Sequence, residues 1–170
     1  MSNFATTFSV EQTPAEVFDA VTNVRGWWSE EIEGSTDQLD AEFRYHRLDL
    51  HRCTMKVTEL VPGERVVWRV LDNYFDFTED KSEWLGTEVR FELSATDEGT
   101  QLRFAHIGLV PEYECFDICS NAWGAYIRGS LRNLITTGQG QPNPKEDPAD
   151  MTVARERTTR GVVAAERSGR

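Results

Sequence analysis

The chain has 170 residues, of which 18 are basic and 29 acidic, so its formal net charge is −11 at pH 7. Residues 139–170 hold six basic and five acidic side chains, which leaves 12 basic and 24 acidic ones in residues 1–138. A body with this charge repels phosphate backbones and anionic lipids, so we expect no nucleic-acid partner. No run of apolar residues is long enough for membrane insertion.

The first part of the chain is predicted to form a strand followed by a capped helix. Apolar and polar residues alternate over residues 3–10, which is typical of a half-buried strand. Thr13 and Glu16 then have the spacing of a capping box at a helix N-terminus. Residues 24–32 predict a second short helix or a turn.

The middle of the chain is predicted to be an antiparallel meander. Turn sequences at 62–64 and 97–99 separate runs that are rich in β-branched and aromatic residues. The predicted strands cover residues 41–48, 51–61, 64–72, 84–96 and 100–107. Tight connections between consecutive strands favour antiparallel pairing over a parallel α/β sheet.

A long helix and a polar tail complete the chain. Apolar residues recur every three or four positions from about residue 113 to 137, which predicts a helix with one buried face. Gly138 stands where a left-handed residue often ends a helix. The rest is rich in proline and then in charge, so we predict one domain over 1–138 and a flexible tail over 139–170.

Four sequence segments resemble a known family. They are "VFDAVTNVRGWW" at 17–28, "ELVPGERVVWRV" at 59–70, "EWLGTEVRFEL" at 83–93 and "HIGLVPEYECFDICSNAWGAYIRGSLRNLITTGQG" at 106–140. Together with the element order, they resemble the START-like (SRPBCC) superfamily, in the branch of activator of Hsp90 ATPase homologue 1-like proteins. The resemblance implies an α+β helix-grip fold, in which a curved antiparallel sheet wraps around a long C-terminal helix with two short N-terminal helices.

The resemblance also implies a function. Members of the superfamily bind hydrophobic molecules in a cavity between the sheet and the C-terminal helix, and some are cyclases or hydrolases. We therefore expect the chain to bind a small hydrophobic or amphipathic ligand. Two alternatives stay open, a cavity-based enzyme acting on a similar ligand and an Hsp90-activator-like interaction module.

The residues expected to line the cavity lie on the inner face of the predicted strands, on the buried face of the long helix or next to it. They are Trp28, Tyr45, His51, Met55, Trp68, Trp84, Phe91, Phe104, His106, Phe116, Cys119 and Trp123. If the protein is an enzyme, His106 is the candidate acid or base, with Tyr126 or Glu114 as its partner.

A metal site was weighed against simple packing for His106, Cys115 and Cys119. The two cysteines are four residues apart and so share a helix face, and the histidine could approach from the preceding strand. Structural zinc sites normally contain more closely spaced pairs, and free cysteines pack as small apolar side chains. We therefore expect neither a metal nor another cofactor.

The remaining expectations concern location and partners. The N-terminus lacks a basic start followed by an apolar stretch, so we expect a cytoplasmic protein with reduced cysteines. A homodimer is left open. An Hsp90-type chaperone is not expected as a partner, because the chain starts directly with the predicted domain and lacks the additional N-terminal domain of the eukaryotic activator.

Overall fold

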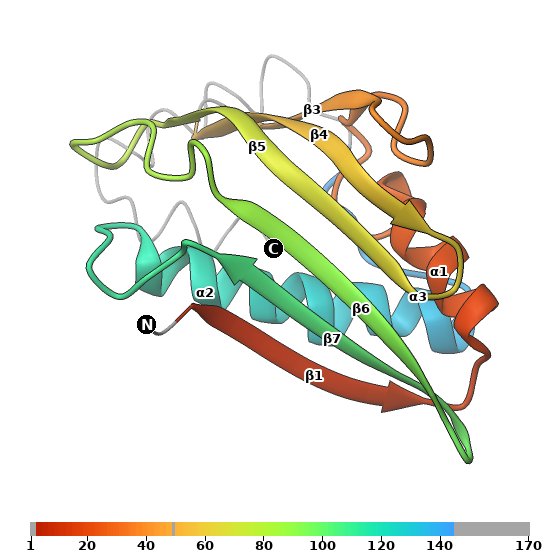
Figure 1. Cartoon of the computed structure of the whole chain (residues 1–170). Coiled ribbons are helices and arrows are strands. Elements are labelled where there is room, and N and C mark those ends of the chain that lie inside the picture. The colour runs from red at the N-terminus through yellow and green to blue at the C-terminus, as the bar shows by residue number, and fades with distance from the viewer. Residues whose placement is uncertain (1–2, 49, 145–170) are drawn as a thin grey trace.

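The computed structural model describes residues 3–48 and 50–144, in which a curved antiparallel sheet packs against a long helix (Figure 1). The strands are β1 (Phe4–Val10), β2 (Glu33–Gly34), β3 (Glu42–Arg47), β4 (His51–Val61), β5 (Arg65–Phe75), β6 (Glu88–Thr96) and β7 (Gly99–Ile107). They pair in the order β1-β7-β6-β5-β4-β3-β2. The helical elements are α1 (Pro14–Thr22), the 3-10 turn η1 (Val24–Gly26), α2 (Phe116–Gly124), the π-helical segment η2 (Ala125–Leu131) and α3 (Arg132–Thr137).

This architecture confirms the predicted helix-grip class. Figure 1 shows α2, η2 and α3 as one continuous helix that crosses behind β6, β7 and β1. Within the described residues, none of the helices combines the length and the apolar character needed to span a membrane.

The N-terminus of α1 and the C-terminus of α3 form where the sequence predicts them, whereas the long helix, predicted from about residue 113, begins at Phe116. The Thr13 backbone N–H donates to Glu16 Oε1 over 3.0 Å, and the Glu16 N–H donates to Thr13 Oγ1 over 3.2 Å. This capping box satisfies backbone donors that the first turn of α1 leaves unpaired. At the other end, Gly138 has φ 86° and closes α3 in the left-handed conformation.

One predicted strand start is wrong. Residues 84–87 were assigned to a strand, but β6 begins only at Glu88. Gly86 has φ 81°, a left-handed conformation, and the Thr87 hydroxyl donates to the Trp84 carbonyl over 2.6 Å, so the chain turns here. Trp84 therefore belongs to the loop between β5 and β6. The two-residue strand β2 was not predicted, because it is too short to show alternation.

The core fills the space between the sheet and the helix. On β7, Leu102, Phe104 and His106 are fully buried, as the alternation predicts. On the helix, Trp123 and Ile127 are buried against them. Each such apolar side chain contributes roughly 1.5–3 kcal/mol to folding, so the interior is the stabilising centre of the domain as well as the candidate site.

The chain remains attached to the domain after the long helix ends. Residues 139–144 pack back on the domain, and Asn143 forms a parallel β-bridge with Ser29. The contact therefore extends six residues past the predicted domain end at 138. The rest of the predicted tail, 145–170, lies outside the described residues.

Candidate functional site

The twelve residues predicted to line a cavity all lie between the sheet and the helix or at its border. Eleven of them are buried and Phe116 is half-buried. The fold thus brings together residues from a turn, five strands, a loop and a helix, although they span residues 28 to 123. Their role in ligand binding stays a prediction.

Tryptophan rings dominate one end of this interior. The Trp28 ring centroid lies 4.2 Å from that of Tyr45, 5.9 Å from that of Trp68 and 5.1 Å from that of Trp123. Trp27, which the sequence analysis did not assign to the interior, is fully buried and stacks on both Trp28 and Trp68. The result is a continuous aromatic wall inside the domain, in which the rings pack on one another.

His106 lies in a directed chain of hydrogen bonds. The Trp123 indole N–H donates to His106 Nδ1 over 3.0 Å. Because an indole nitrogen only donates, Nδ1 must accept and the imidazole proton must sit on Nε2. That proton is donated to Thr87 Oγ1 over 2.8 Å, and the Thr87 hydroxyl in turn donates to the Trp84 carbonyl. The predicted partners Tyr126 and Glu114 are therefore wrong.

This arrangement holds His106 neutral. Burial, with a smaller contribution from repulsion by His51 when that ring is protonated at low pH, lowers the pKa of His106 to about 3. Protonation at Nδ1 would also place two donors face to face with the Trp123 N–H. Since the only basic lone pair of the ring already accepts a hydrogen bond, the geometry favours a positioning role over that of a general base.

His51 is also buried and neutral, and the hydrogen bond from its Nε2 fixes its tautomer. Its Nε2–H donates to Asn73 Oδ1 over 2.8 Å, and the amide orientation is fixed because Asn73 Nδ2 donates to the Lys81 carbonyl. Burial lowers the pKa of His51 to about 3, against the opposing effect of the Asn73 bond. Since Nε2 carries the proton, the lone pair of the neutral ring is on Nδ1.

Two buried indole donors have no acceptor. The Nε1 atoms of Trp68 and Trp84 are inaccessible to solvent and make no hydrogen bond to the described residues. By contrast, the Trp27 indole donates to the Val21 carbonyl over 3.2 Å, and that of Trp123 to His106. An unsatisfied buried donor costs about 1–3 kcal/mol, and native structures hold few of them.

Residues 139–144, which we call the strap, lie against the end of η2, the start of α3 and the segment 26–30. The Gln141 N–H donates to Ser130 Oγ over 2.7 Å. Gly140 packs so closely that an added Cβ would collide with the Gly26 carbonyl oxygen. No hydrophobic periodicity marks this segment, which is why the sequence analysis placed it in the tail.

Asn143 of the strap reaches a polar corner of the aromatic interior. Its backbone N–H donates to the Trp28 carbonyl over 3.0 Å, and its carbonyl accepts from Glu30 N–H over 2.9 Å. Its side-chain Nδ2 donates to both Tyr126 Oη (2.8 Å) and Tyr45 Oη (3.3 Å). Tyr126 belongs to η2, and π-helical segments occur frequently at functional sites.

Two of the three cysteines lie at the start of α2. Cys115 and Cys119 are buried in the first turns of α2, and no three His, Cys, Asp or Glu side chains in the described ranges lie close enough to hold a metal ion. The Glu83 carboxylate accepts from the backbone N–H groups of Glu114 (2.8 Å) and Cys115 (3.0 Å). A carboxylate at a helix N-terminus is favourable, so Glu83 ties the loop between β5 and β6 to α2.

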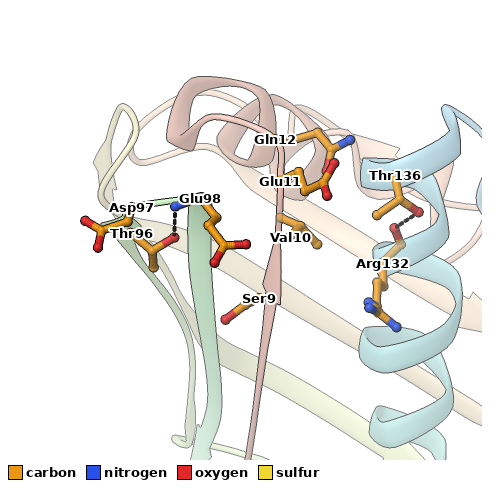
Figure 2. A pocket seen from close by; sticks show the side chains of 9 residues that line it. All are labelled: Ser9, Val10, Glu11, Gln12, Thr96, Asp97, Glu98, Arg132 and Thr136. Carbon is orange, nitrogen blue, oxygen red and sulfur yellow. Dashed lines mark hydrogen bonds between the residues drawn. The ribbon is translucent and has the colours of Figure 1, made fainter.

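A separate pocket of about 680 Å³ opens on the surface near the end of β1. Figure 2 shows Arg132 on its helix side and Glu11 and Glu98 on its strand side. None of the predicted cavity residues lines it. Its charged, open lining does not provide the apolar surroundings that a hydrophobic ligand requires.

Comparison with known proteins gives a family and several similar folds. The family model described as "Activator of Hsp90 ATPase homolog 1-like protein" matches residues 11–136. The solution structure of the Aha1 dimer from Colwellia psychrerythraea is 23% identical with a TM-score of 0.66, covering 82% of this chain and 100% of that one. A crystal structure from Mesorhizobium loti is 14% identical with a TM-score of 0.62, covering 75% and 92%.

A third similar structure is that of a protein in the dynemicin biosynthetic locus, with 18% identity and a TM-score of 0.62, covering 83% of this chain and 50% of that one. No curated protein matches the sequence.

Proposed function

The chain belongs to the family of activator of Hsp90 ATPase homologue 1-like proteins, and we propose that it binds a small, neutral, hydrophobic or amphipathic molecule between the sheet and the C-terminal helix. The proposal rests on the composition of the interior, which combines aromatic faces with a few polar atoms. Pockets for small molecules typically have this composition.

The observation that carries the proposal is the pair of unsatisfied indole donors on Trp68 and Trp84. A ligand oxygen that accepts one of these hydrogen bonds would remove a desolvation penalty that the ligand-free protein bears. Trp84 is the better placed of the two. It lies on a loop, so its ring can move without breaking a strand, and it contacts His51 at 4.6 Å between ring centroids.

The polar groups of the interior favour a neutral ligand. His51 and His106 both have pKa values lowered to about 3 by burial, so neither carries a charge that could pair with an anion near neutral pH. A buried ligand charge without a partner would be strongly unfavourable. The acidic body adds a further barrier to anionic ligands.

The proposal can be tested by titrating the protein with N-phenyl-1-naphthylamine, a neutral probe that fluoresces in apolar surroundings. We expect binding to the wild type and a loss of at least about tenfold in affinity in Cys119→Trp, because the larger ring adds volume at a buried position on the helix face that also carries Trp123. Asn121→Trp is the matched control, since residue 121 is exposed on the same helix.

Equal affinity in wild type and Cys119→Trp, with circular dichroism showing that both are folded, would contradict binding in the interior. If none of the three proteins binds the probe, the proposal as a whole is contradicted.

A further inference from the structure

We infer that the Asn143 carboxamide occupies the head-group subsite of the ligand, so that the strap acts as an internal competitor that the ligand must displace. The inference rests on the proposed function. It adds the chemistry of the ligand's polar end, a neutral group with N–H donors such as a primary amide, and a means of control by the chain's own C-terminal segment.

The first argument is the geometry of the tyrosine pair. Tyr45 on β3 and Tyr126 on η2 come from opposite sides of the interior, yet their hydroxyl oxygens lie 3.4 Å apart. The Asn143 amide bridges them by donating to both oxygens, and its residue is only 4% exposed. A small neutral head group with two N–H donors would make the same two bonds.

The second argument is the position of this pair at the edge of the aromatic wall. The Tyr45 ring stacks on Trp28 at 4.2 Å, and the Tyr126 ring lies 6.3 Å from both Trp28 and Trp123. Tyr126 is itself half-buried, so the pair lies where the interior meets solvent. A molecule whose head replaces the carboxamide would therefore place its apolar part against Trp28.

The third argument is the way the strap is held. Its backbone is anchored to Trp28, Glu30 and Ser130, whereas the Asn143 side chain donates hydrogen bonds to the tyrosine pair through its amide nitrogen. Removing the side chain thus leaves the backbone anchors in place and opens a small polar space. Such spaces can accept a ligand group of the missing shape, and displacement of an internal competitor lowers the apparent affinity of any ligand.

The test compares 2-naphthamide with 2-methylnaphthalene, which keeps the rings but lacks the amide, in wild type and in Asn143→Ala. The two lost hydrogen bonds predict that Asn143→Ala binds 2-naphthamide about tenfold more tightly or better. The affinity for 2-methylnaphthalene should change much less. Asn121→Ala, an exposed asparagine on α2, should behave as the wild type.

A second substitution guards against an indirect effect. Adding Tyr126→Phe to Asn143→Ala removes one acceptor hydroxyl while keeping the ring. It should abolish most of the gain in affinity for 2-naphthamide and leave the affinity for 2-methylnaphthalene nearly unchanged. Unchanged 2-naphthamide affinity in Asn143→Ala, or an equal gain for both compounds, would overturn the inference while leaving the proposed function intact. If N-phenyl-1-naphthylamine also fails to bind, both are overturned together.

Discussion

Acidification from pH 7 to pH 5.5 is expected to lower the free energy of unfolding by about 2–3 kcal/mol, because His51 and His106 must stay neutral in the folded protein. Their pKa values in the fold are lowered to about 3, whereas a histidine in an unfolded chain has a pKa of about 6.5. Between these values the unfolded chain binds more protons than the folded one. The stability that depends on these two neutral histidines is therefore largely present above pH 6.5 and is lost progressively as the pH falls from 6.5 toward 3.

The magnitude follows from proton linkage. Each buried histidine contributes a slope that approaches about 1.4 kcal/mol per pH unit below pH 6.5, so the folded state loses slightly more than about 1 kcal/mol per histidine by pH 5.5. Over this range most carboxylates remain ionised, so the histidines dominate. The loss is large compared with a typical total stability of about 5–15 kcal/mol.

The assay is urea unfolding at a series of pH values, followed by the fluorescence of the five tryptophans. His51→Gln and His106→Gln should each remove about half of the pH dependence, whatever their effect on stability at pH 7. Leu102→Ala is the control, since it weakens the same core without removing a titrating group and should keep the full dependence. A stability that is flat between pH 7 and pH 5.5, or a slope that both histidine variants retain, would refute the reasoning.

Three further predictions concern stability and use the same unfolding assay at pH 7. Thr87→Val should destabilise the protein by about 1–3 kcal/mol, because it leaves a buried imidazole N–H without an acceptor, while Thr87→Ser should restore most of the loss. Glu83→Gln should cost about 0.5–2 kcal/mol, because the start of α2 loses its carboxylate, and a fully neutral effect would contradict that role. Gly140→Ala should destabilise by about 1–3 kcal/mol through the collision with the neighbouring backbone. Gly124→Ala, where an added methyl group meets nothing within 4 Å, should be neutral or stabilising.

Local patterns were sufficient to predict most of the fold. Alternation placed Phe91, Phe104 and His106 on one face of the sheet, and all three are fully buried. The capping residue Thr13 and the terminator Gly138 marked helix ends because their effects act within one turn. Trp84 was misplaced because the turn that contains it depends on a hydrogen bond from Thr87, which alternation does not reveal.

The candidate site was less predictable, since its polar contacts join residues that are distant in sequence. The partners of His106 are 19 and 17 residues away, and spacing alone cannot identify them. The bond between Asn143 and Tyr45 spans 98 residues and involves a segment without periodicity. Composition predicted an aromatic interior, but only coordinates reveal which donors lack an acceptor, as in Trp68 and Trp84.

Native mass spectrometry of the freshly purified protein, compared with its denatured mass, tests the central claim of ligand binding most directly. We predict an organic adduct that is lost on denaturation or, for ligand-free protein, a one-to-one complex after incubation with N-phenyl-1-naphthylamine that Cys119→Trp does not form. Detection of the unliganded mass alone, both as purified and with excess probe, would contradict the account.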